Sequence, residues 1–269
     1  GPSPPPPAAL AGGKGASLFV LMRSGCAVPP GFIICNPAFS KVTVDLENGV
    51  PTSVSWPVRM WKLKRALKAS FPADGRVIVR SSFVEEGAGE ASFSGLYDSV
   101  PDVPARDAGA VADAVIRVIA SYWSLRAAIY RAEKGFDSDE PRPAVIVQQQ
   151  IDTQWRGAAF SADPATGCRE KTVVEAAAGD AAPDVFVHDA VRGKWSRRPG
   201  GGAPPESLFP FLEDIRRALE KLERAQDGRP AQVEWGVAEG KLYFFQYRPA
   251  VSLPETETYT SAYLADAPD

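Results

Sequence analysis

Three polar residues near the end of the sequence have side chains suited to holding a metal ion and a phosphate. They lie in two neighbouring segments that read as strands, where a side-chain period of two puts Gln246 and Arg248 on one face. Pairing around the turn Glu239-Gly240 brings Glu234 close to Gln246. A carboxylate and an amide oxygen are hard ligands that suit Mg²⁺. The alternative is a solvated hairpin face, which the bulky apolar neighbours disfavour.

A lysine near the start of the chain lies in the glycine-rich segment Gly12-Gly13-Lys14-Gly15, directly before an expected helix over 16–24. Glycines let a backbone approach a phosphate, a helix N-terminus favours anions, and Lys14 adds a point charge. The segment is not the G-x-x-x-x-G-K-[ST] phosphate loop. A turn with a solvated lysine explains it equally well.

An arginine closes the β-rich segment Arg76 to Arg80. At the end of a buried strand Arg80 can project into a cleft, where its planar fork suits a phosphate. The stretch Ser81 to Asp98, which carries glycine and serine, can close over phosphates as a hairpin or lid. The alternative is a structural ion pair of Arg80 with one of the nearby acids Glu85, Glu86 and Glu90.

Helices and strands that would position these residues follow from the apolar periodicity. The expected helices cover 16–24, 56–70, 107–134 and 208–224. The expected strands cover 32–35, 76–80, 144–151, 157–161, 171–176, 232–237 and 241–246, with a hairpin over 184–195. The polar, proline-bearing stretch Gly135 to Pro143 is the expected lobe boundary.

Composition narrows the classes of function. The chain has 269 residues, a net charge of −3 and an apolar fraction of 45%, as a globular protein with one large domain or two lobes would have. Without a broad basic field, nucleic acid is a poor partner, and no apolar run approaches the roughly 20 residues of a membrane span. The three cysteines fit neither a disulfide framework nor a zinc site, so reduced thiols and a cytoplasmic location are expected.

The order of these motifs resembles the phosphoenolpyruvate synthase and pyruvate phosphate dikinase family, whose ATP-binding domain is shared by rifampin phosphotransferases. The matching segments run in the family's order: Gly12 to Leu18, Val28 to Phe32, Val79 to Ser82, Glu90 to Gly95, Trp123 to Ala127, Val147-Gln148, Gly157 to Phe160, Asp163 to Gly167, Val233 to Trp235 and Phe245 to Pro249. Residues Val84 to Gly87 stand where the family has a threonine and an acidic pair.

The resemblance implies a role for each matching position. Lys14 and Arg80 would contact ATP phosphates, and Arg248 would bind the transferred phosphates; these three are the candidate catalytic residues. Glu234 and Gln246 would hold Mg²⁺. The resemblance further places Gln148 near the adenine, and a segment over the nucleotide would contain Gly95, Ser99 and Val100.

The implied fold is an α+β, two-lobed ATP-grasp fold with mixed or antiparallel sheets and flanking helices. Its N-terminal lobe would span 12–143 and its C-terminal lobe 144–250. Residues 1–11 would be a disordered or tag-derived tail and 251–269 a C-terminal tail. The family's phosphohistidine domain is not expected in this chain, because His188, the single histidine, lacks the family's Thr-Ser-His surroundings and reads as a surface residue.

The leading interpretation is an ATP-dependent, kinase- or dikinase-like phosphotransferase. It would bind Mg-ATP and pass phosphate to a histidine of a partner protein or of a domain outside this chain. One alternative is a stand-alone small-molecule kinase or ATP-dependent ligase of a specialised pathway. Another is a non-catalytic nucleotide-binding module, against which the presence of Lys14, Arg80, Glu234, Gln246 and Arg248 argues.

Overall fold

The computed structural model describes residues 8–35, 41–44, 51–55, 60–87, 95–136, 143–200 and 202–250. The chain divides into two compact units. The first comprises residues 1–156 together with Glu234–Arg248, and the second comprises Gly157–Val233 with residues 249–269. The expected C-terminal tail and the first seven residues of the expected N-terminal tail lie outside the described residues.

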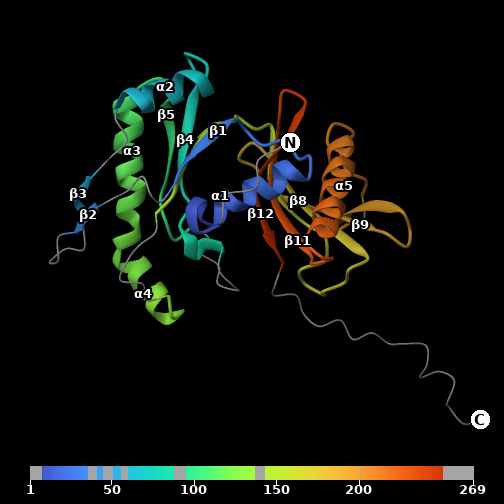
Figure 1. Cartoon of the computed structure of the whole chain (residues 1–269). Coiled ribbons are helices and arrows are strands. Elements are labelled where there is room, and N and C mark those ends of the chain that lie inside the picture. The colour runs from blue at the N-terminus through green and yellow to red at the C-terminus, as the bar shows by residue number, and fades with distance from the viewer. Residues whose placement is uncertain are drawn as a thin grey trace, which may run out of the picture. The chain divides into compact units, whose positions relative to one another are not determined.

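A four-stranded antiparallel sheet forms the centre of the first unit (Figure 1). Its strands are β1 (Gly31–Ile34), β6 (Val145–Gln149), β4 (Arg76–Ser81) and β5 (Ser99–Pro104), in that order. Val79 pairs with Val147 in register, and both are fully buried. Because side chains alternate along a strand, Arg80 and Gln148 point to the opposite face of the sheet.

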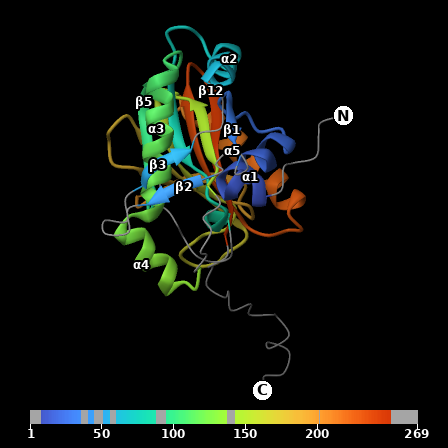
Figure 2. The ribbon, with the colours of Figure 1, turned by 60° about the vertical axis from the view of Figure 1, so that its left-hand side comes forward.

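The buried face of this sheet packs against α2 (Met60–Ser70) and α3 (Ala108–Ala120). Figures 1 and 2 both show α3 lying along β4 and β5. Its apolar stripe, which includes Val111, Val115 and Val118, is fully buried. Asp107 begins the helix by accepting hydrogen bonds from the amides of Gly109 and Ala110.

The helix α1 (Ala8–Arg23) contains a break at Gly12, where φ is 72° and ψ is 174°. The sequence placed residues 1–11 in a tail, but Ala8 to Ala11 are helical and Ala11 is fully buried. A Cβ atom at Gly12 would lie 1.6 Å from the backbone oxygen of Ser82, so the backbone there tolerates only glycine. The expected turn over 12–15 is therefore a kink within a helix.

The expected single helix over 107–134 is two helices, α3 and α4 (Leu125–Glu133), joined by a 3₁₀ turn over Ser121–Trp123. The hydroxyl of Ser121 donates to the carbonyl of Val118, and Ser124 accepts from the amide of Ala127, so two serines end one helix and start the next. No single described helix is long and apolar enough to cross a membrane; α3 and α4 together pass by length and composition but are bent by 48°.

Two smaller elements complete the first unit. The strands β2 (Lys41–Val44) and β3 (Pro51–Ser55) form an antiparallel pair that the sequence did not predict. The 3₁₀ turn η2 (Val84–Gly87) follows β4 within the stretch that was expected to form a hairpin or lid. Residues 88–94 of that stretch lie outside the described residues.

The second unit contains strands of a sheet and one described helix. Its strands are β7 (Trp155–Phe160), β8 (Lys171–Ala178), β9 (Asp184–Asp189), β10 (Lys194–Arg198) and β11 (Ala231–Ala238). The neighbours follow the order β10-β9-β8-β7-β11, and of these β8, β9 and β10 pair antiparallel. The helix α5 (Phe209–Ala225) buries Leu212, Ile215 and Leu219. Strand β11 continues into the first unit, where β12 (Lys241–Pro249) is its neighbour.

The sequence predicted a lobe boundary between residues 143 and 144, but the two units of the structure are not divided there. Strand β6 pairs with β1 and β4, so residues 144–156 belong to the first unit. Glu234–Arg248 also belongs to the first unit. Composition marks where a linker is polar, but it does not reveal which distant strand a segment pairs with. The α+β class with antiparallel sheets and flanking helices is confirmed.

Candidate functional site

The predicted polar residues meet in the first unit, around the guanidinium group of Arg80. Its Nη1 donates to the carbonyl oxygen of Phe245 at 3.1 Å, and its Nη2 lies 3.8 Å from Oε2 of Glu234. The Arg80 side chain is 13% exposed, whereas that of Glu234 is 40% exposed. The end of β4 is thereby joined to β12, and the Glu234 carboxylate remains accessible.

The amide of Gln246 lies between two guanidinium groups. One of its terminal atoms is 3.4 Å from Nη2 of Arg80, and the other is 2.6 Å from Nε and 2.8 Å from Nη2 of Arg248. Both arginines can only donate, and the contacts to Arg248 are shorter, so the amide oxygen is assigned to the Arg248 side. The oxygen that the sequence assigned to Mg²⁺ therefore accepts hydrogen bonds from Arg248.

Lys14 is held by two neighbours at the start of the second part of α1. Its Nζ lies 2.9 Å from Oγ of Ser81 and 2.6 Å from Oε1 of Glu86. The sequence offered Glu86 as a partner of Arg80, but the structure pairs Glu86 with Lys14 and Arg80 with Glu234.

The charges of this cluster act on one another. Burial lowers the pKa of Lys14, the Glu86 carboxylate opposes this effect, and the charges of Arg80 and Arg248 lower the pKa further. Burial also lowers the pKa of Arg80, while Glu234 and Glu86 act to raise it. The same cluster therefore brings together three cations and two carboxylates, an arrangement that can bind a polyanion and a metal ion.

Sequence reasoning missed the serines that fix the backbone beside Lys14. The Ser82 hydroxyl accepts from the amide of Gly15 at 2.8 Å and donates to the carbonyl of Ala11 at 2.6 Å. Both Ser81 and Ser82 are fully buried. The sequence placed both serines in an expected hairpin or lid, although two adjacent serines directly after a buried strand could have indicated that they bond to a neighbouring backbone.

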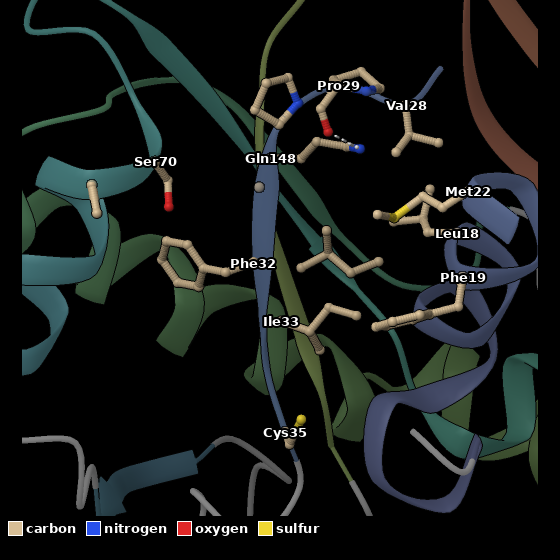
Figure 3. Close-up of a pocket in the computed structure, with 14 residues that line it drawn as sticks. Leu18, Phe19, Met22, Val28, Pro29, Phe32, Ile33, Cys35, Ser70 and Gln148 are labelled. Carbon is tan, nitrogen blue, oxygen red and sulfur yellow. Dashed lines mark hydrogen bonds between the residues drawn. The ribbon is translucent and has the colours of Figure 1, made fainter. Parts of the chain in front are cut away.

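Gln148 is buried, and its Nε2 donates to the carbonyl of Pro29 at 3.1 Å, a bond drawn in Figure 3. It borders a mostly apolar cavity of about 600 Å³ along β1. Figure 3 shows Leu18 and Met22 on one side of β1 and Ser70 on the other. One of the two amide hydrogens of Gln148 is thus bonded to the protein backbone.

The segment that was expected over the nucleotide has two different settings. Ser99 and Val100 lie in strand β5, opposite Arg80 and Val79, and Val100 packs against the core. Gly95 is exposed with a φ of 68°. The side chain of Val100 therefore packs in the core of the first unit, a contact that the resemblance did not imply.

Among the described ranges, no group of three or more His, Cys, Asp and Glu residues is placed so that it could hold a metal ion. Glu234 and Gln246 nevertheless offer two oxygen donors of the kind that Mg²⁺ accepts when nucleotide phosphates and water supply the rest. The exposed fraction of Glu234 and its long distance to Arg80 leave its carboxylate able to take up such an ion.

His188 lies outside this cluster, on β9 of the second unit. It is half-buried rather than a surface residue, and its ring packs against Trp195 with 5.2 Å between ring centroids. Burial lowers its pKa. No disulfide bond joins Cys26, Cys35 and Cys168, all of which lie in the described ranges.

Curated relatives of the chain carry related names. It is 29% identical to "Probable phosphoenolpyruvate synthase" of Methanothermobacter thermautotrophicus, over 93% of this chain and 45% of that protein. It is also 29% identical to phosphoenolpyruvate synthase of Pyrococcus furiosus, over 94% of this chain and 43% of that protein. An uncharacterized phosphotransferase of Bacillus subtilis is 26% identical, over 91% of this chain and 34% of that protein. The chain spans less than half the length of these relatives.

Among solved structures, D-alanyl-alanine synthetase A of Vibrio cholerae matches 89% of this chain and 55% of its own, with 11% identity and a TM-score of 0.45. The sequence model of one family, described as pyruvate phosphate dikinase, AMP/ATP-binding domain, matches residues 46–198. Because this match covers more than half of the 269 residues, the chain belongs to the family of pyruvate phosphate dikinase AMP/ATP-binding domains.

Proposed function

We propose that the cluster of the first unit binds Mg-ATP and that the chain is the ATP-binding part of a phosphoenolpyruvate-synthase-type phosphotransferase. The observation that carries the proposal is the convergence of Lys14, Arg80 and Arg248 beside two oxygen donors, Glu234 and Gln246. Family membership and the names of the relatives support the same reading.

In this proposal the protein works mainly by positioning and by neutralising charge, as phosphoryl transfer requires. Lys14 and Arg80 bind phosphate oxygens, and Arg248 binds the phosphates that are transferred. Glu234 and Gln246 hold Mg²⁺, which neutralises phosphate charge when bound. For the Gln246 oxygen to hold Mg²⁺, it must either contact Mg²⁺ and Arg248 together or turn away from Arg248.

The base of the nucleotide is proposed to lie near Gln148. In this proposal the bond from the Gln148 amide to Pro29 orients the side chain, and its oxygen and second N–H group are the atoms that would contact the base. Gly95, Ser99 and Val100 remain candidates for contacts to the nucleotide, and for Val100 such a contact would involve the backbone because its side chain packs on the core.

The phosphate acceptor is proposed to be a histidine on a partner protein or on a domain outside this sequence. A small-molecule acceptor is the alternative within the same enzyme class. Transfer by dikinase-type chemistry yields AMP and phosphate, whereas simple kinase or ligase chemistry yields ADP. The cytoplasm remains the expected location.

Calorimetric titration of the chain with ATP, with and without Mg²⁺, tests the proposal. We expect binding that requires Mg²⁺, followed by turnover when an acceptor is added. Chromatographic identification of AMP or ADP then distinguishes the two acceptor classes. Absence of ATP binding in the presence of Mg²⁺ would refute the proposal, and binding without turnover under any acceptor would favour a non-catalytic module.

A further inference from the structure

Glu86 is a carboxylate whose two oxygens are both engaged within the protein. Its Oε1 accepts from Nζ of Lys14 at 2.6 Å and from Oγ of Ser81 at 2.9 Å. Its Oε2 accepts from the backbone amide of Phe83 at 2.8 Å. The side chain is 2% exposed, so water contributes little. A buried carboxylate with three donors is fixed in one orientation.

The other groups that face Lys14 oppose its charge or are neutral. Arg80 on β4 and Arg248 on β12 repel the ammonium group, and Ser81 is neutral. The Lys14 side chain is only 13% exposed, so solvent stabilises the charge weakly. Among the described neighbours that act on its charge, Glu86 is the group that favours it.

The three cations of the cluster also differ in kind. Arginine stays protonated at any physiological pH, whereas a lysine in a desolvated setting readily loses its proton. Lys14 is therefore the member of the set whose charge depends on a partner, and Glu86 is that partner.

The residues from Ser82 to Glu86 also fix the backbone that carries Lys14. The amide of Gly13 donates to the carbonyl of Phe83 at 3.0 Å, and the amide of Gly15 donates to Ser82. The amide of Phe83 in turn holds Glu86. The segment from Ser82 to Glu86 therefore fixes both the backbone around Lys14 and the position of the Lys14 side chain.

We propose that Glu86 is the positioning residue for Lys14: it holds the ammonium group beside Ser81 and keeps it charged before a nucleotide binds. Its consequence for phosphate binding rests on the proposed function, in which Lys14 contacts ATP. A nucleotide that reaches the site then meets a lysine that is already oriented and protonated.

The variant Glu86→Gln tests this in the full chain without nucleotide. NMR titration of ¹³C-labelled lysine side chains, with the Lys14 signal identified by its loss in Lys14→Met, should show the pKa of Lys14 lower than in the wild type by about one unit or more. Glu133→Gln, which removes an exposed carboxylate at the end of α4, is the matched control and should leave that pKa unchanged. An unchanged Lys14 pKa in Glu86→Gln would overturn the proposal.

The pH dependence of ATP affinity gives a second readout, which a merely structural role would not produce. A protonated Lys14 favours the triphosphate, so affinity falls as pH rises through the pKa of Lys14. In Glu86→Gln this fall should occur at lower pH, so that affinity is lost at a pH between the two Lys14 pKa values and is wild-type or tighter at a pH below both. An equal loss of ATP affinity at both pH values would indicate that the variant only displaces the Lys14 side chain. It would overturn the proposal that Glu86 keeps Lys14 charged.

A second variant covers the case in which Glu86→Gln does not fold. Glu86→Asp keeps a charge but shortens the reach, so the Lys14 pKa should fall by less than in Glu86→Gln but measurably below the wild type. An unchanged pKa and unchanged affinity would overturn the proposal. If the wild type bound no ATP at all, the proposed function would fail, whereas the pKa measurement would still decide the role of Glu86.

Discussion

Two regions of the molecule gather basic side chains, and they differ in what surrounds the charges. In the first unit, Lys14 and Arg80 are each 13% exposed and each is paired with a carboxylate. In the second unit, a cavity of about 180 Å³, here called the basic hollow, is lined by Lys171, Val187, Asp189, Arg192, Lys194, Ser196 and Arg198. The numbers of cations are similar, so charge alone does not distinguish the two regions.

The cations of the basic hollow are exposed or half-buried, although Arg198 also pairs with the buried Asp163 at 3.2 Å. Arg192 is 73% exposed, and its ion pair with Asp189 is long, at 3.9 Å. Asp189 mainly closes the hairpin turn, because its Oδ1 accepts from the amides of Val191 and Arg192. Exposed pairs of this kind contribute little to stability. Burial is what forces a charge to have a partner, and a fixed partner is what gives a charge a fixed position.

The largest expected effect concerns the backbone that surrounds Lys14. Gly12→Ala should destabilise the protein by about 3–5 kcal/mol, because a Cβ atom would collide with the Ser82 carbonyl at a positive φ. Urea unfolding measures the effect. Gly193→Ala in the hairpin of the basic hollow is the matched control, since its φ is 64° and nothing lies within 4 Å. Its cost should be about 1 kcal/mol. An equal loss of unfolding free energy in both variants would show that the backbone at Gly12 accepts a side chain as readily as the backbone at Gly193.

Glu234→Ala should abolish Mg-dependent ATP binding, with an affinity loss of about a hundredfold or more in calorimetry. Because Glu234 is 40% exposed and its pair with Arg80 is long, the free energy of unfolding should change by less than about 1 kcal/mol. Asp113→Ala on the exposed side of α3 is the control and should bind as the wild type does. Unchanged affinity in Glu234→Ala would refute the metal assignment.

The sequence predicted those features of the fold and the site that depend on local residue pattern. The β-rich run from Arg76 placed Arg80 at the end of a strand, and a period of two put Gln246 with Arg248; both placements agree with the structure. The helix stripe that includes Val111 and Val115 was visible in the same way.

What the sequence did not predict depends on contacts between distant segments. The pairing of β6 with β4, the partner of Glu86 and the kink at Gly12 each involve residues about 70 positions apart. The local composition of a segment does not indicate which distant residues it contacts. The break at Ser121 is different, because there a local serine bond ended a helix whose apolar stripe would otherwise have continued.

Arg80→Lys should weaken ATP binding by about tenfold, because the ammonium group lacks the planar fork with which Arg80 bonds the Phe245 carbonyl through Nη1 and faces Glu234 through Nη2. Competition with a fluorescent ATP analogue measures the change. Arg192→Lys in the basic hollow is the control, since its exposed charge has no fixed geometry to lose. If both variants bound ATP as the wild type does, the planar fork of Arg80 would be irrelevant to the site.

The smallest effect is expected from the basic hollow itself. Lys171 and Lys194 flank Asp189 across the neighbouring strands, so replacing both with alanine removes one half-buried and one exposed cation from one sheet face. ATP affinity at physiological salt should stay within about twofold of the wild type, because cations that stay hydrated are screened by salt and hold no phosphate in a fixed geometry. Calorimetry at two salt concentrations measures it. A tenfold loss that disappears at high salt would break the comparison, since an exposed cation of the second unit would then attract the nucleotide as effectively as a buried, partnered cation of the first.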